Sequence, residues 1–151
     1  MDAGRLYREG TIEGASAVAL VARLYEQIVK DVRQALNALE QNNVELRTKK
    51  INHAILVIGY LESQLNHEAG GQVAEDLRNF YRTLRQNLVQ AQFKRSKLLL
   101  AQLITDLLAV REAWLEVERA ERAAMADAAR LVPATADTSS ASRAAHVDWK
   151  G

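Results

Sequence analysis

The chain has 151 residues, with 20 basic and 19 acidic side chains and no cysteine. A net charge of +1 gives no general attraction for nucleic acid, so we expect no nucleic-acid partner. The absence of cysteine excludes disulfides, thiol nucleophiles and thiolate metal sites, and the length suits one domain with its own core.

Residues 1–14 are polar, and two large side chains, Tyr7 and Ile12, stand alone among them. Because this segment lacks an apolar stripe, we expect an extended or mobile arm. Ser16 is a suitable N-cap for a helix that follows it. The apolar run at 15–22 is too short and wrongly flanked by charge for a signal peptide or membrane span. We therefore expect a cytoplasmic protein without membrane insertion.

Four amphipathic helices are predicted from apolar residues that recur at spacings of three and four. Residues 15–132 contain no proline and three glycines, so few breaks interrupt this pattern. The amides at 41–43 end the first helix, and Gly70-Gly71 reverses the chain after the second. Ser96 is a candidate N-cap for the fourth helix, although one long helix also fits the pattern there.

The apolar pattern weakens after Val117, where alanine and charged residues take over. Glu118 and Arg122 are spaced as an i,i+4 pair typical of an exposed helix, and Pro133 ends it. The Ala/Ser/Thr-rich remainder is expected to be disordered. We predict an all-α protein built from an arm at 1–14, an antiparallel four-helix bundle at 15–117, a helical extension at 118–132 and a tail at 133–151.

The first two helices carry more apolar side chains than a bundle core requires. About three positions in seven suffice for a core-facing stripe. Leu24 in the first helix, and Leu56 and Tyr60 in the second, add to stripes that are already complete. Exposed apolar surface of this kind usually marks an interaction site, and a helical partner lying in a groove is a natural use of it.

The residue types used in catalysis and metal binding form no familiar pattern. His53, His67 and His146 lack the spacing of paired helical metal ligands, and the serines lack a Gly-x-Ser-x-Gly context. The Glu-x-x-His pairs of a di-iron bundle are absent from the sequence. We therefore expect no enzyme activity, no metal, no cofactor and no small-molecule substrate.

Basic residues gather on the third helix and just beyond it. The cluster consists of Arg78, Arg82, Arg85, Lys94, Arg95 and Lys97. In a chain of balanced charge, a solvated polar face accounts for such a cluster. The functional alternative is an acidic partner.

Short motifs follow one another along the chain in a specific order. They are Tyr7, Ile12 and Ala15-Ser16, then Leu24-Tyr25, then Leu65-Asn66, Gly70-Gly71, Ala74, Asp76-Leu77 and Tyr81, and finally Arg111 and Ala113-Trp114. Together they cover roughly residues 7–117 and resemble the flagellin export chaperone family, FliS. The chain departs from the family pattern at Ala17-Val18, where a Pro-Glu pair is usual, and around Gln92 and Arg95, where asparagines are usual.

The resemblance implies a function and a set of partners. The family binds the C-terminal segment of flagellin in the cytoplasm, prevents premature polymerisation and assists delivery to the flagellar type III export apparatus. Export-gate components are further candidate partners. A regulatory or adaptor bundle that binds another helical partner is the alternative function.

The resemblance also implies that the N-terminal arm occupies part of the binding surface when cargo is absent. We therefore expect Tyr7 and Ile12 to act as a displaceable plug. The residues expected to contact the partner at the surface are Leu24, Tyr25, Leu56 and Tyr60, with help from Tyr81. Core packing is the alternative interpretation for Tyr25 and Tyr81, because both also fit the core-facing stripes.

Overall fold

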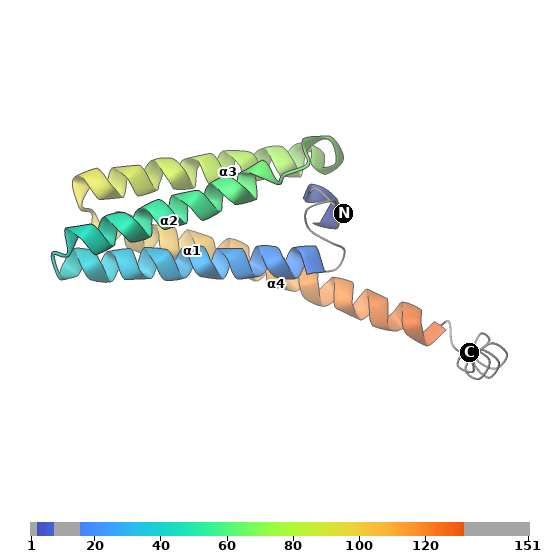
Figure 1. The fold of residues 1–151 in the computed structure, drawn as a ribbon. Helices are drawn as coiled ribbons and strands as arrows, with labels where there is room; N and C mark the ends of the chain where they lie inside the picture. Colours follow the sequence, from blue (N-terminus) through green and yellow to red (C-terminus); the bar gives the residue numbers. More distant parts are fainter. Residues whose placement is uncertain (1–2, 8–15, 132–151) are drawn as a thin grey trace, which may run out of the picture. The chain divides into compact units, whose positions relative to one another are not determined.

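The computed structural model describes residues 3–7 and 16–131, and all regular elements within these ranges are helical (Figure 1). In chain order they are the short 3₁₀ helix η1 (Ala3–Leu6), α1 (Ser16–Glu40), α2 (Val44–Ser63), α3 (His67–Lys94) and α4 (Lys97–Leu131). The chain forms two compact units, one up to Val117 and one from Glu118 onwards. The predicted all-α, four-helix architecture is confirmed.

In the first unit, α1, α2 and α3 lie side by side, each antiparallel to its neighbour, and α4 packs behind them (Figure 1). An ion pair between Arg111 and Glu26, 2.8 Å apart, links α4 to α1. The apolar stripes face one shared core. Its fully buried members include Val21, Ile28, Ile58, Leu88 and Leu103.

The turn between α3 and α4 is short and well defined. Arg95 adopts the left-handed conformation, with φ 52° and ψ 47°, and ends α3. The Ser96 hydroxyl oxygen accepts a hydrogen bond from the Leu99 amide at 3.0 Å, so Ser96 caps α4 as predicted. The alternative of one long helix is wrong. Gln92 anchors this end of α3 to α2 by accepting a hydrogen bond from the buried side chain of Arg47 at 3.0 Å.

The turn between α2 and α3 is shorter than the glycine pair suggests. The Asn66 side chain accepts a hydrogen bond from the Ala69 amide at 3.1 Å, which starts α3 before the glycines are reached. Gly71 then breaks the helical geometry, with φ 55° and ψ −133°. That conformation favours glycine, so Gly71 marks a kink within α3 and not a loop.

The second unit is described over residues 118–131, which continue as helix. The predicted Glu118–Arg122 pair is present, with 2.7 Å between the charged groups. Ile12 and His146 lie outside the described residues, as do most of the predicted arm and the predicted tail. Within the described helices, no segment combines the length and apolar character needed to cross a membrane.

Candidate partner-binding site

Residues 3–7, called here the docked arm, pack against the bundle where α2 turns into α3. Leu6 and Tyr7 are 3% and 1% exposed. The Leu6 carbonyl accepts a hydrogen bond from the Asn66 amide at 2.7 Å, and Tyr7 forms an isolated antiparallel bridge with Leu65. Main-chain pairing combined with side chains in pockets is how folded domains often hold a short extended peptide.

Gly70 makes room for the docked arm. A Cβ atom at position 70 would lie 2.8 Å from Cδ2 of Leu6 and 2.7 Å from Cβ of Ala74. Contacts that short do not occur between real Cβ atoms and their neighbours. Gly70 therefore leaves room for both Ala74 and Leu6, and Gly71 allows the kink.

Three buried phenols, called here the tyrosine cluster, join the arm to two helices. The hydroxyl oxygens of Tyr7 and Tyr81 are 2.7 Å apart, and the Tyr25 hydroxyl donates to that of Tyr81 at 2.8 Å. The Tyr7 ring also packs against the indole of Trp114, with 5.9 Å between the ring centroids. The arm is thus held to α1, α3 and α4 at one point.

Burial keeps the tyrosine cluster neutral. It raises the pKa of Tyr25 from 10.0 to about 12 and raises the pKa values of Tyr7 and Tyr81 as well. Three neutral phenols in an apolar environment act as hydrogen-bond donors and acceptors rather than as acids or bases. Their arrangement is suited to holding chain segments together.

Tyr25 and Tyr81 were both candidates for surface contacts, and the structure corrects that prediction for the arm-docked conformation. Both side chains are 0% exposed. Their hydroxyls satisfy one another and their rings, 6.2 Å apart at the centroids, fill space between α1 and α3. Both tyrosines are packed in the core in this conformation, as the alternative interpretation predicted.

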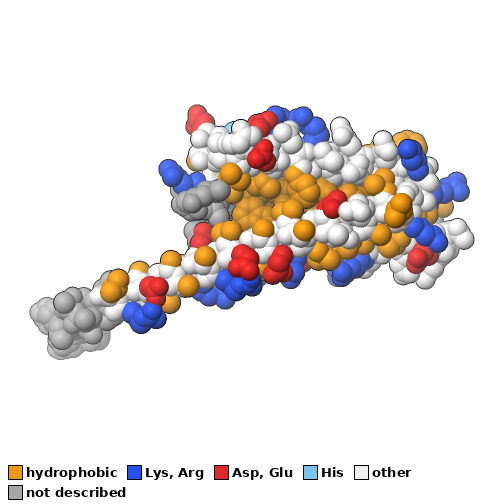
Figure 2. Space-filling model, turned by 180° about the vertical axis from the view of Figure 1, so that it is seen from behind, with side chains coloured by type: hydrophobic (Ala, Val, Ile, Leu, Met, Phe, Trp, Pro, Cys, Tyr) orange, Lys and Arg blue, Asp and Glu red, His pale blue; other side chains and the backbone are white. Residues whose placement is uncertain are grey.

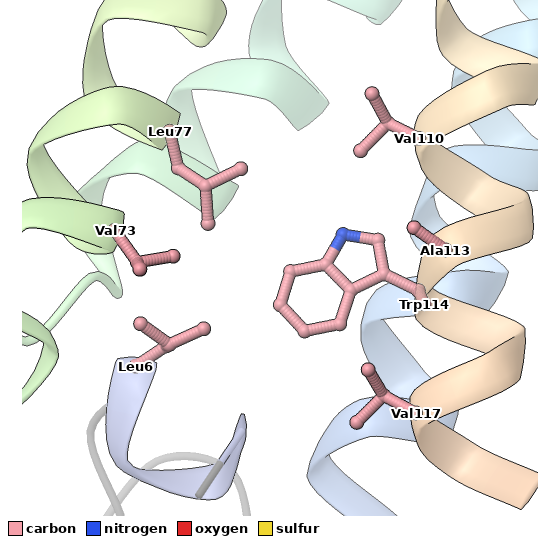
Figure 3. Close-up of a pocket in the computed structure, with 7 residues that line it drawn as sticks. All are labelled: Leu6, Val73, Leu77, Val110, Ala113, Trp114 and Val117. Atoms are coloured by element: carbon pink, nitrogen blue, oxygen red, sulfur yellow. The ribbon is translucent and has the colours of Figure 1, made fainter. Parts of the chain in front are cut away.

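An apolar cleft lies beside the docked arm, between α3 and α4. Its volume is about 260 Å³. The residues that line it are Leu6 of the arm, Val73 and Leu77 of α3, and Val110, Ala113, Trp114 and Val117 of α4 (Figure 3). Figure 2 shows apolar side chains gathered beside α4 on this side of the molecule. The α3–α4 cleft can accept an apolar side chain without any change in the bundle.

A second depression, the α2 groove, lies on another part of the surface. It is open, has a volume of about 670 Å³ and is lined by Leu24, Ile55, Leu56, Val57, Gly59, Tyr60, Ser63 and Arg85. Leu56 is 68% and Tyr60 is 40% exposed. Arg85 forms an ion pair with Glu62 at the edge, so the groove combines an apolar floor with a charged rim.

The part of the chain that carries these features matches a known family. The family model for the flagellar protein FliS matches residues 1–121, which include the docked arm, the tyrosine cluster, the cleft and the groove. The chain belongs to the flagellar protein FliS family.

Two relatives are flagellar secretion chaperones by name. Flagellar secretion chaperone FliS of Vibrio cholerae serotype O1 is 24% identical over 106 residues, which are 70% of this chain and 78% of the relative. Flagellar secretion chaperone FliSB of Pseudomonas aeruginosa is 29% identical over 118 residues, which are 76% of this chain and 94% of the relative. The end of α4, from residue 122 onwards, lies beyond the FliS match.

In this FliS family member, the predicted contact residues fall into two groups. Leu24, Leu56 and Tyr60 lie together in the α2 groove. Tyr7 joins Tyr25 and Tyr81 in the interior and does not line that groove. The docked arm therefore fills space next to the α3–α4 cleft and leaves the α2 groove open.

Sequence reasoning did not find the α3–α4 cleft in this FliS bundle. Val73, Leu77, Val110 and Trp114 belong to apolar stripes at helical spacing, a pattern that predicts core packing and not a cleft. Beside the large indole of Trp114 the cleft is lined by leucine, valine and Ala113 side chains, which leave part of the volume unfilled. Small residues next to a tryptophan at helical spacing are the available signal, and it is a weak one.

His53 makes a local polar contact in the FliS bundle. Its Nδ1 atom lies 2.5 Å from the carboxylate of Asp31, which is 1% exposed, and Gln27 donates to the same carboxylate at 3.1 Å. These contacts satisfy a buried acid between α1 and α2. Among residues 3–7 and 16–131, no group of three or more histidine, aspartate or glutamate side chains is placed to hold a metal.

Proposed function

We propose that this protein is a cytoplasmic export chaperone that binds the C-terminal segment of flagellin. It prevents premature polymerisation of flagellin and assists delivery to the flagellar type III export apparatus, where export-gate components are further partners. Membership of the FliS family and the names of the two relatives support this role. The observation that carries the proposal is the docking of Leu6 and Tyr7, since the bundle already holds a short apolar segment in a built site.

The two depressions suggest how a longer segment is bound. The family's cargo is apolar and helix-prone, and it is unstructured as a monomer. The α2 groove is open and offers Leu24, Leu56 and Tyr60 to one apolar face of such a segment. The α3–α4 cleft becomes larger once Leu6 leaves it, and it then binds a second part of the flagellin segment. Burial of cargo side chains, at about 25 cal/mol per Å² of apolar surface, offsets the ordering of the segment without any chemical step.

The docked arm is held weakly enough to be displaced. Burying the side chains of Leu6 and Tyr7 contributes about 1.5–3 kcal/mol each, and each hydrogen bond that holds them contributes about 1 kcal/mol. Ordering the backbone of residues 3–7 costs about 1–2 kcal/mol per residue. These opposing terms are of similar size, so the arm exchanges between docked and undocked states and acts as a plug.

Calorimetric titration with the C-terminal ~40 residues of flagellin, a length that spans several helical turns at about 1.5 Å per residue, tests this function. We expect saturable one-to-one binding with a negative heat-capacity change, which is the sign of apolar burial. A folded protein that does not bind the segment would contradict the proposal. That result would favour an adaptor bundle for another helical partner, to be identified by an unbiased pull-down.

A further inference from the structure

The turn between α3 and α4 presents apolar and basic side chains to solvent together. Phe93 and Leu98, on either side of the turn, are 82% and 81% exposed. Lys94, Arg95 and Lys97 lie between them and are exposed as well. Within the described ranges, no ion pair involves any of these three cations. Residues 93–98 are called here the basic turn.

Folding of the bundle does not account for this composition. Lys94 and Arg95 suit the negative end of the α3 dipole. Lys97, however, lies in the first turn of α4, where the dipole is positive and no acidic residue is present. The large exposed areas of Phe93 and Leu98 contribute little to the core. A contact outside the bundle would explain both features.

The shape of the basic turn favours a flat partner. The left-handed Arg95 closes a connection of two residues, so the turn lies at an end of the bundle, as the turn between α1 and α2 does (Figure 1). The cleft and the groove described above are lined by other residues. Apolar side chains stand beside basic ones at the right-hand end of the bundle in Figure 2. A helical peptide is normally bound in a groove, whereas an exposed end of the bundle can lie against a flat surface.

We propose that the basic turn binds the surface of an anionic lipid bilayer. Phe93 and Leu98 enter the boundary between headgroups and acyl chains, as the apolar faces of interfacial segments do. Lys94, Arg95 and Lys97 lie at the level of the lipid phosphates, and the positive end of α4 adds to their attraction. Binding of the bilayer through the basic turn alone is weak and reversible. This inference goes beyond flagellin binding and does not depend on it.

Cosedimentation of the full-length protein with vesicles tests the proposal. We expect binding to vesicles that contain phosphatidylglycerol and much weaker binding to pure phosphatidylcholine. The triple variant Lys94→Gln, Arg95→Asn, Lys97→Gln should bind about 100-fold more weakly at low salt, from about 5-fold for each cation removed. Asparagine is chosen at position 95 because it tolerates the left-handed conformation.

A matched variant distinguishes the effect of the basic turn on binding from the effect of the protein's net charge. Arg23→Gln, Lys30→Gln, Arg33→Gln removes three exposed cations from α1 and should retain most of the binding. The double variant Phe93→Ser, Leu98→Ser keeps the charge and should also bind more weakly. Circular dichroism and thermal unfolding verify that each variant is folded, as the exposure of these side chains leads us to expect.

Three results would overturn the proposal. The first is no excess binding of the folded protein to phosphatidylglycerol vesicles. The second is an equal loss of binding in the two triple variants, which would indicate general electrostatic attraction. The third is binding to polyglutamate with no binding to vesicles, which would assign the basic turn to an acidic protein partner.

Discussion

The hydroxyl of Tyr7 lies 2.7 Å from the hydroxyl of Tyr81, although 74 positions separate the two residues. The same Tyr81 oxygen receives the hydrogen bond of Tyr25, at 2.8 Å. One phenol on α3 therefore connects the docked arm and α1. Because the surroundings exclude water, these hydrogen bonds are stronger than they would be at the surface, and loss of either partner leaves a buried polar group.

Substitution of Tyr81 by phenylalanine is expected to lower the free energy of unfolding by about 1–3 kcal/mol, because the hydroxyls of Tyr7 and Tyr25 lose their common partner. Urea denaturation measures this change. Tyr60→Phe is the matched control, since it removes a hydroxyl from a side chain that is 40% exposed. It should change stability by less than about 0.5 kcal/mol. Equal effects of the two substitutions would contradict the role given to Tyr81.

Stability is expected to decline at alkaline pH. Burial raises the pKa of Tyr25 from 10.0 to about 12, so the folded protein holds this proton more tightly than the unfolded chain does. The contribution to stability is therefore complete below pH 10 and is lost as the pH rises towards 12. Urea unfolding at a series of pH values measures the decline. Tyr25→Phe should make it shallower, and a constant stability across this range would refute the argument.

Gly70→Ala should loosen the docked arm, because the added methyl group would lie 2.8 Å from Cδ2 of Leu6 as well as 2.7 Å from Cβ of Ala74, so the Leu6 side chain would have to move. Limited trypsin digestion reports this loosening, with faster cleavage after Arg5, an exposed residue of the arm. This variant should also bind the flagellin segment more tightly. Gly59→Ala is the matched control for trypsin cleavage, since a Cβ atom there meets nothing within 4 Å; Gly59 lines the α2 groove, so this variant is not used to compare affinities.

The control substitution should have its own measurable effect. Alanine in the interior of α2 should raise stability by about 0.5–1 kcal/mol over glycine and leave trypsin cleavage of the arm unchanged. Unchanged cleavage after Arg5 in both variants would show that Gly70 does not govern docking of the arm.

Leu56→Ser should weaken binding of the flagellin segment by about 5- to 30-fold, the range for a residue that contributes about 1–2 kcal/mol at an interface. Stability should change little, because Leu56 is 68% exposed. Val44→Ser, on the same helix and 55% exposed, lies outside the α2 groove and should bind normally. Titration calorimetry with all three proteins makes the comparison. Equal affinities for Leu56→Ser and the unchanged protein would exclude the groove.

Sequence periodicity was sufficient for the helices and for the groove. Leu56 and Tyr60 were identifiable because they add to a stripe that the core already completes. Tyr7 could be identified from the sequence as an isolated aromatic residue, but the sequence did not predict that its side chain is buried. Its place in the core depends on Tyr81 and Trp114, which are distant in sequence, and no periodic pattern connects them.

The glycine pair shows a second limit of sequence reasoning. Composition alone suggested a loop at Gly70-Gly71, whereas the side chain of Asn66 begins a helix first. Glycine at position 70 avoids close contacts with Ala74 and with the Leu6 side chain, and only the three-dimensional structure places Leu6 there. The unfilled volume of the α3–α4 cleft is likewise a result of packing and is not encoded in any single segment.

The docked arm and the bundle are parts of one chain, joined by the eight residues 8–15. Because the arm and its docking site belong to one molecule, docking of the arm does not depend on the concentration of the protein. A segment that competes with the arm for this place would bind with an apparent dissociation constant equal to its intrinsic value divided by the undocked fraction. Dilution would reduce binding of the cargo, which is a separate molecule, and would leave docking of the arm unchanged. If the proposed function holds, the tyrosine cluster would set a threshold for binding, because a partner that needs the place of the arm would have to supply the free energy of undocking it.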